Sequence, residues 1–169
     1  MRHVLLTGSE GNVGVVVAPY LSNAGWNVHA VSHADGDLSD PGVAKSIVER
    51  APKPLSAVVH LVGGSKAGEP LENIDMTVYE RMNRTTTFNV MQAAIPVMKS
   101  SGGGSFVTIG AKSVVHPTGN RAVYTMAKSA VVALTRAVAE EGRGHGIRAN
   151  AILPSIIKTP ENLEWASEE

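Results

Sequence analysis

The stretch that decides the fold is Met1-Arg2-His3-Val4-Leu5-Leu6-Thr7-Gly8-Ser9-Glu10-Gly11-Asn12-Val13-Gly14. A short apolar run leads into a turn whose glycines recur every third residue, and an apolar segment of helical character follows. Backbone N–H groups of such a strand-to-helix turn can approach a pyrophosphate, and the N-terminal end of the helix favours its charge. The stretch therefore predicts a dinucleotide site, with a plain tight turn as the alternative. Its expected residues are Gly8, Gly11, Asn12, Val13 and Gly14.

Short runs rich in valine and isoleucine alternate with longer segments of helical periodicity along the rest of the chain. This alternation is typical of an α/β domain with a buried parallel sheet. The expected strands are residues 3–6, 26–31, 57–62, 105–109 and 148–153. The expected helices are residues 13–23, 41–50, 76–99 and 121–141. Right-handed crossovers then give one doubly wound parallel sheet flanked by helices, in a single domain of residues 1–169.

The composition argues against several other classes of protein. With 43% apolar and 18% charged residues among 169, the chain can bury the core of one soluble domain. Fifteen Lys and Arg balance 15 Asp and Glu, so no basic excess favours nucleic acid or a membrane surface. Cysteine is absent, which excludes thiolate metal sites, and the six histidines form no helical i, i+4 metal pair. We expect a cytoplasmic protein that binds a small-molecule substrate and no metal.

The second expected strand ends at Ser32-His33, where the adenosine ribose of a bound dinucleotide would lie. An acid at this place binds the ribose hydroxyls of NAD. Its absence from the strand end favours the 2′-phosphate of NADP, to which His33 could donate a hydrogen bond. Asp35 is the alternative, as a ribose ligand for NAD. The expected cofactor is therefore NADP or NAD, with NADP favoured.

Two further loops are expected to touch the cofactor. The pair Asp37-Leu38 is expected to face the adenine, while Asp40 caps the helix that begins at Pro41. The third expected strand ends in Val62-Gly63-Gly64, where glycine allows close backbone approach to a ligand. An ordinary loop is the alternative at this third place.

The segment Tyr124-Thr125-Met126-Ala127-Lys128 carries the strongest chemical signal. A spacing of four puts the phenol and the ammonium on one helical face, one turn apart. Tyrosine ordinarily has a pKa near 10, so acid or base catalysis at neutral pH needs a shift of its pKa. A nearby ammonium would lower that pKa. Such a pair is common on helix surfaces, but behind a dinucleotide turn it indicates an oxidoreductase.

With these motifs the chain resembles the short-chain dehydrogenase/reductase family over about residues 4 to 160. The matching pieces are the Thr7-Gly8 turn, Asp37-Leu38, Asn83, the Tyr124/Lys128 pair and Arg148-Ala149-Asn150-Ala151-Ile152-Leu153-Pro154. The resemblance implies a Rossmann-type fold and hydride transfer between a nicotinamide and a small carbonyl or quinonoid compound. It also implies a homodimer or homotetramer formed through the two long helices. Family members continue for another strand and helix, so the usual C-terminal strand is expected to be lacking here.

The resemblance also implies a role for each matching residue. Tyr124 is expected to be the proton donor, and Lys128 is expected to hold the nicotinamide ribose and lower the pKa of Tyr124. Asn83 is expected to anchor a water relay. The segment after the last strand is expected to contact the carboxamide; its residues are Pro154, Ser155, Ile156, Ile157 and Thr159.

Two departures from the family pattern shape the substrate prediction. The chain reads His60-Leu61-Val62-Gly63 where Asn-Asn-Ala-Gly is usual, and Ala111 stands where the family places a catalytic serine. Ser113 could substitute if the loop is rearranged. Dihydropteridine reductases share the departures, so the chain resembles that branch, and a quinonoid substrate would tolerate the loss of the serine. The alternative function is a catalytically degenerate NAD(P)-binding regulator.

Overall fold

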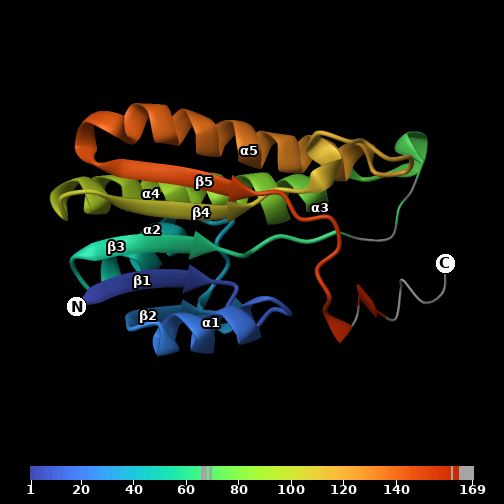
Figure 1. Cartoon of the computed structure of the whole chain (residues 1–169). Coiled ribbons are helices and arrows are strands. Elements are labelled where there is room, and N and C mark those ends of the chain that lie inside the picture. Colours follow the sequence, from blue (N-terminus) through green and yellow to red (C-terminus); the bar gives the residue numbers. More distant parts are fainter. Residues whose placement is uncertain (66–67, 69, 161, 164–169) are drawn as a thin grey trace.

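A parallel five-stranded sheet in the order β2-β1-β3-β4-β5 runs through this computed structural model, which describes residues 1–65, 68, 70–160 and 162–163 (Figure 1). Its strands are β1 (Arg2–Thr7), β2 (Trp26–Val31), β3 (Leu55–His60), β4 (Gly104–Ile109) and β5 (Ile147–Ile152). The strand order reverses direction between β1 and β3. In doubly wound sheets a ligand binds at this switch point, outside the carboxyl ends of the strands. The predicted fold class is therefore confirmed.

The helices form a layer on each face of the sheet. They are α1 (Gly14–Asn23), α2 (Pro41–Arg50), α3 (Met76–Tyr79), α4 (Thr86–Ser100) and α5 (Ala122–Gly142). In Figure 1, α1 lies in front of the sheet, while α2 and α4 lie behind it. Helix α5 packs along β5 and β4, and its Val138 joins the same core as α2 and α4.

The core lies between the sheet and the layer of α2, α4 and α5. The parallel register pairs Leu5 with Val58 and Val58 with Phe106, and all three side chains are fully buried. Because alternate residues of a strand face the same side, these three form one apolar row across three strands. Ile47 of α2 and Met91 of α4 are buried in the same cluster. Burial of this face holds the central strands in register.

The expected elements are found, with two differences. Strand β3 begins and ends two residues earlier than residues 57–62, and only the pairing of Leu61 N–H with the Thr7 carbonyl continues beyond it (3.0 Å). The expected single helix over residues 76–99 is divided by a π-helical turn, Glu80–Thr85. Asp40 caps α2 as predicted, because its carboxylate accepts hydrogen bonds from Gly42 N–H (2.7 Å) and Val43 N–H (3.0 Å).

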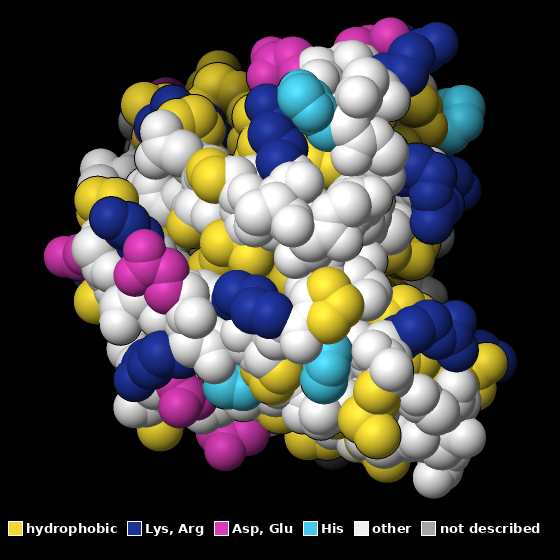
Figure 2. Space-filling view, turned by 90° about the vertical axis from the view of Figure 1, so that its left-hand side faces the viewer, with side chains coloured by type: hydrophobic (Ala, Val, Ile, Leu, Met, Phe, Trp, Pro, Cys, Tyr) yellow, Lys and Arg dark blue, Asp and Glu magenta, His cyan; other side chains and the backbone are white. Residues whose placement is uncertain are grey.

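The surface at the amino ends of the strands carries charges of both signs. Figure 2 shows basic, acidic, histidine and apolar side chains interspersed on this face, without a continuous basic area. In the part of the chain that the structure describes, no helix has the length and apolar character needed to cross a membrane. The same residues contain no group of three or more His, Asp and Glu that could hold a metal ion.

Removing the Phe106 ring should destabilise the fold strongly. Phe106 is fully buried on β4, so Phe106→Ala should lower the free energy of unfolding by about 3–5 kcal/mol. Tyr20→Ala is the matched control, because the Tyr20 ring is 72% exposed on α1 and should cost less than about 1 kcal/mol. Urea denaturation of both variants measures the difference. Equal losses would contradict the assigned core.

Candidate active site

The glycine turn after β1 is folded tightly against the start of α1. Gly8 has a positive φ of 78°, and the N–H groups of Gly8 and Ser9 both donate to the Val31 carbonyl of β2. A Cβ atom on Gly14 would lie only 2.1 Å from the Gly8 carbonyl oxygen, so no larger residue fits there. Helix α1 begins at Gly14, and Val13 before it supplies no side-chain cap. The N-terminal end of α1 is thus left without a side-chain cap behind a tight glycine turn, which fits a pyrophosphate.

At the end of β2, the expected ribose site holds a carboxylate. Asp35 accepts a hydrogen bond from Ser32 N–H at 2.8 Å, and Ser32 Oγ accepts one from Ala34 N–H at 3.3 Å. His33 is exposed beside this capping box. Residues 32 and 33 carry no acid, as the sequence shows, and Asp35, the alternative ribose ligand, is held against the strand end. The short 3-10 turn, His33–Asp35, brings the acid back to the strand end.

Asp37, which was expected to face the adenine, is engaged with protein groups. Its carboxylate accepts a hydrogen bond from Ser39 N–H (2.8 Å) and pairs with the Arg81 guanidinium. The Ser39 N–H bond, with help from Arg81, lowers the pKa of Asp37 to about 2. Leu38, also expected to touch the cofactor, is instead buried in the apolar core. Asp37 thus fastens the loop before α2 to the π-helical turn.

Gly63, Asn83 and Lys128 meet at the carboxyl edge of the sheet, although they are far apart in sequence. A Cβ atom on Gly63 would lie 2.8 Å from both Asn83 Oδ1 and Lys128 Nζ. The Asn83 amide is tied to the next residue of the loop: it donates to the Gly64 carbonyl (3.1 Å) and accepts from Gly64 N–H (3.2 Å). Lys128 donates to the Ile109 carbonyl at 2.9 Å. The close approach predicted for Gly63 is therefore made to two predicted catalytic side chains.

The π-helical turn explains how Asn83 comes to face this edge. Asn83 Nδ2 also donates to the Tyr79 carbonyl, one turn earlier, at 3.0 Å. Such side-chain insertion into the backbone ladder interrupts an α-helix, and π-turns of this kind are frequent at functional sites. Thr87 donates to the Asn83 carbonyl at 2.7 Å. Sequence periodicity missed the turn because the apolar spacing on either side of it remains helical.

Tyr124 and Lys128 lie on one face of α5, as their spacing predicts. Lys128 Nζ is 6.0 Å from the centre of the Tyr124 ring. Burial raises the pKa of Tyr124, and the Arg121 guanidinium opposes that rise. Burial lowers the pKa of Lys128 to about 8. The expected lowering of the Tyr124 pKa by Lys128 is not found in this geometry: the ammonium is directed to the Ile109 carbonyl, and burial is the largest influence on the pKa of Tyr124.

The loop after β4 places Ala111 and Ser113 differently. Ala111 is buried, and it precedes a 3-10 turn, Lys112–Val114, that packs against α5. Ser113 Oγ is buried within this turn and has no hydrogen-bond partner among the described residues. A buried hydroxyl without a partner is costly and calls for an explanation. Because the hydroxyl is closed off from the surface here, a substrate oxygen could reach it only after the loop is rearranged.

The segment expected to contact the carboxamide follows β5 along the same sheet edge (Figure 1). The Pro154 carbonyl accepts a hydrogen bond from Lys112 N–H at 2.8 Å, which joins this segment to the Ser113 loop. Thr159 is buried, and its hydroxyl accepts from Asn162 N–H (3.3 Å). Ser155 and Ile156 are exposed, and Ile157 is partly buried. The segment thus starts beside the candidate site and then leaves the sheet.

His60 is a buried part of the site to which sequence reasoning gave no role. Its Nδ1 is 2.7 Å from Thr7 Oγ1, and its Nε2 is 3.4 Å from Thr86 Oγ1. Thr86 gives its own proton to the Met82 carbonyl (2.8 Å), so His60 Nε2 is the donor to Thr86 and Nδ1 the acceptor from Thr7. Burial, with a contribution from Lys128, lowers the pKa of His60 to about 3. The sequence did offer a signal for His60, because a histidine stands there where the family pattern usually has asparagine.

The sequence of this chain is similar to a known family model and to several curated proteins. A family model described as enoyl-(acyl carrier protein) reductase matches residues 13–168. The rat (3R)-3-hydroxyacyl-CoA dehydrogenase is 36% identical over 78% of this chain and 53% of its own length. The curated relatives are longer, and this chain spans from about half to three quarters of their length.

Two solved structures have the same fold. A short-chain type dehydrogenase/reductase from Mycobacterium ulcerans aligns with a TM-score of 0.92 and 26% identity, over 99% of this chain and 72% of that one. A 3-ketoacyl-(acyl-carrier-protein) reductase from Brucella melitensis, solved with NADH, aligns with a TM-score of 0.89 and 20% identity, over 96% and 78%. The latter likeness concerns the fold alone.

The buried neutral His60 should make the fold sensitive to acid. Because the pKa of His60 is about 3 in the folded chain and near 6.5 when unfolded, the unfolded state binds more protons between these pH values. The free energy of unfolding should therefore fall as pH drops below about 6.5, by at most about 1.4 kcal/mol per pH unit from this group.

Urea denaturation between pH 7 and pH 4 measures this dependence. His60→Asn, which cannot titrate, should be less stable at pH 7 but should lose less stability on acidification than the parent chain. His145→Asn removes an exposed histidine and serves as the control, with an expected slope like that of the parent. A slope unchanged in His60→Asn would contradict the assignment.

Proposed function

Because the chain belongs to the short-chain dehydrogenase/reductase family, we propose that it is an NAD(P)-dependent oxidoreductase acting on a small carbonyl or quinonoid substrate. The observation that carries the proposal is the meeting of Gly63, Asn83 and Lys128 at the carboxyl edge of the sheet, one helical turn from Tyr124. The glycine turn after β1 opens onto the same edge. A dinucleotide bound there would span both places.

A nicotinamide cofactor supplies the hydride when it is bound, and the protein manages the proton. Tyr124 would donate its phenolic proton to the substrate oxygen on which negative charge develops. The Tyr124 phenol, with its pKa raised by burial, is protonated at neutral pH, as an acid in the direction of reduction must be, but the rise also makes it a weaker acid. Lys128, with its pKa lowered to about 8, remains mainly charged at neutral pH and would hold the nicotinamide ribose.

Asn83 has a supporting part in this proposal. Its amide forms two hydrogen bonds with Gly64, so it fixes the loop that carries Gly63 beside Lys128. Removing it would free that loop and leave the Tyr79 and Gly64 carbonyls without these partners. The water relay that the family resemblance implies at Asn83 stays a prediction.

The class of substrate depends on the loop after β4. Ser113 is proposed to polarise the carbonyl oxygen in place of the serine that is missing at Ala111, because its buried hydroxyl has an unfilled hydrogen bond. The name of the rat relative, a hydroxyacyl-CoA dehydrogenase, supports alcohol and carbonyl chemistry. Reduction of a quinonoid substrate would depend less on polarisation of an oxygen by Ser113. The closeness to dihydropteridine reductases stays a prediction.

The choice between NADP and NAD is proposed to rest on two neighbouring side chains. His33 is exposed and could donate to a 2′-phosphate, which favours NADP. The Asp35 carboxylate lies at the end of β2, where it could accept from the ribose hydroxyls of NAD. Binding of NADPH and of NADH is measured with the parent chain and with Asp35→Asn. If Asp35 binds the ribose, removal of its carboxylate should shift the preference toward NADPH.

Turnover that depends on Tyr124 tests the proposed function. NADPH and NADH oxidation is followed over a panel of ketones, quinones and quinonoid pterins. Tyr124→Phe removes only the hydroxyl and should lower kcat by at least about 100-fold, while cofactor affinity, measured by fluorescence titration, changes little.

Ser113→Ala separates the substrate classes. It should slow ketone reduction about 100-fold and leave quinonoid reduction nearly unchanged, because only the ketone oxygen needs the hydroxyl. If the chain binds the cofactor but shows no turnover that Tyr124→Phe abolishes, the proposal is overturned. That result would support the alternative, an NAD(P)-binding regulator.

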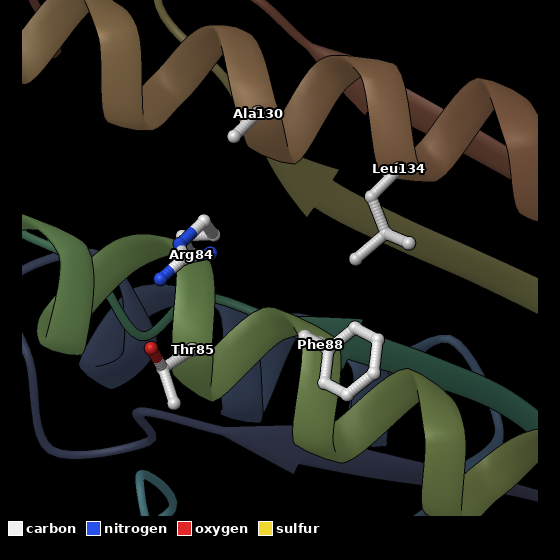
Figure 3. Close-up of a pocket in the computed structure, with 5 residues that line it drawn as sticks. All are labelled: Arg84, Thr85, Phe88, Ala130 and Leu134. Atoms are coloured by element: carbon white, nitrogen blue, oxygen red, sulfur yellow. The ribbon is translucent and has the colours of Figure 1, made fainter.

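We further propose that α4 and α5 form the interface of a homodimer or homotetramer. A depression of about 350 Å³ lies between these helices, lined by Arg84, Thr85, Phe88, Ala130 and Leu134 (Figure 3). The Phe88 ring is 45% exposed beside it, and Ala130 offers a small surface on the facing helix. An aromatic side chain next to a shallow apolar depression is typical of an interface anchor.

A charge on the proposed interface should prevent assembly. Phe88→Glu should sediment as a monomer at micromolar concentration, whereas the parent chain should sediment as a dimer or tetramer. Val16→Glu is the matched control: Val16 is 66% exposed on α1, across the sheet, and its substitution should leave the sedimentation coefficient unchanged. A monomeric parent chain would contradict the proposed interface.

A further inference from the structure

Arg121 stands where helix energetics would not place a cation. It is the residue at the N-terminal boundary of α5, three positions before Tyr124, and it supplies no side-chain cap to the helix. The N-terminus of a helix carries partial positive charge, so a basic side chain there is unfavourable. Asp, Asn, Ser or Thr would cap the same position. The unfavourable choice suggests that the guanidinium acts on something other than the helix.

The contacts of Arg121 direct its charge toward Tyr124. The guanidinium carbon lies 6.0 Å from the centre of the Tyr124 ring, and Nη1 donates to Ser65 Oγ at 2.8 Å. Ser65 directly follows Gly63-Gly64, the loop that Asn83 holds. Lys128 Nζ lies at the same distance of 6.0 Å from the ring. Two cations, one turn before and one turn after Tyr124, therefore flank its ring.

The two cations are not equivalent. Lys128 is buried, and its ammonium is directed to the Ile109 carbonyl. Arg121 is half-buried, and guanidinium stays charged throughout the range in which proteins remain folded. A fixed positive charge near a phenol favours the phenolate. Arg121 is also the group that opposes the rise in the pKa of Tyr124 caused by burial.

We propose that Arg121 is a positioning residue that sets the acidity of Tyr124, with Ser65 holding the guanidinium beside the ring. The inference rests on the proposed function, in which Tyr124 gives up its proton and is left as a phenolate. Arg121 stabilises that phenolate and so offsets part of the cost of burying it. The role differs from that of Lys128, which is to bind the cofactor.

Other titratable groups lie on the elements that pack against α5. Tyr79 of α3 packs in the cluster that includes Tyr124. The π-helical turn packed on α5 carries Glu80, Arg81 and Arg84, and the 3-10 turn after β4 carries Lys112, followed by His116. These groups are present in every variant described below, so differences between variants report Arg121.

The acidity of Tyr124 can be measured without turnover. Ionisation of tyrosine changes its ultraviolet absorbance, and the chain has three tyrosines, Tyr20, Tyr79 and Tyr124. Subtracting the titration of Tyr124→Phe from that of the parent isolates Tyr124, and the same subtraction is made in each Arg121 background. Circular dichroism over the titrated range shows whether each variant stays folded.

We expect Arg121→Gln to raise the pKa of Tyr124 and Arg121→Lys to restore most of its acidity. Ser65→Ala should give a smaller rise, because the guanidinium loses an anchor but keeps its charge. Arg136→Gln removes an exposed arginine from the far part of α5 and should leave the titration unchanged. A Tyr124 titration in Arg121→Gln that coincides with the parent curve would overturn the inference.

Kinetics supply a second measurement. In the reductive direction Tyr124 must be protonated, so kcat falls as pH rises through its pKa. Arg121→Gln should move that fall to higher pH and lower kcat at neutral pH by roughly threefold to tenfold, with little change in the KM for the cofactor. If the parent chain shows no turnover, only the proposed function is contradicted. The absorbance titration would still test the effect of Arg121 on the pKa of Tyr124.

Discussion

The structure depends on a row of buried polar side chains at the carboxyl edge of the sheet. The parallel register aligns Thr7 of β1 with His60 of β3, and His60 with Thr108 of β4. All three are buried, so each needs a hydrogen-bond partner inside the protein. His60 finds Thr7 and Thr86, and Thr108 finds Thr135 of α5 at 2.8 Å. The row therefore fastens the start of α4, directly after the π-helical turn, and α5 to the ends of the central strands.

The candidate site follows from this fastening. Thr86 lies three residues after Asn83, and Thr135 lies two turns after Lys128 on the same helix. The two helices thus arrive at the sheet edge with Asn83 and Lys128 aimed at Gly63, where a Cβ atom would collide with both. Apolar packing holds α4 and α5 on the sheet, and this row adds one buried polar contact to each helix at the strand ends. His60, a departure from the family pattern, is its central member.

Features that depend on neighbouring residues alone were predictable from the sequence. The periodicity of apolar residues gave β2 and α2 with their observed bounds, and Asp40 before Pro41 predicted the cap of α2. The glycine turn and the Tyr124 and Lys128 spacing were likewise readable, because a tight turn and one helical face are short-range properties. Prediction from the sequence failed where a distant residue intervenes: the amide of Asn83 breaks the expected helix, and Arg81 and Ser39 engage Asp37.

The sequence by itself determined the class of fold, the position of the glycine turn after β1 and the spacing that puts Tyr124 and Lys128 on one face of α5. Only the tertiary structure decided which cations bear on Tyr124 and in what direction its pKa moves. Burial is a property of the whole fold, and it raises the pKa of a phenol that lysine spacing alone would suggest is lowered. The reason is that an electrostatic effect depends on distance and on exclusion of water, and both arise only when α5, the loop after β3 and the strand ends meet.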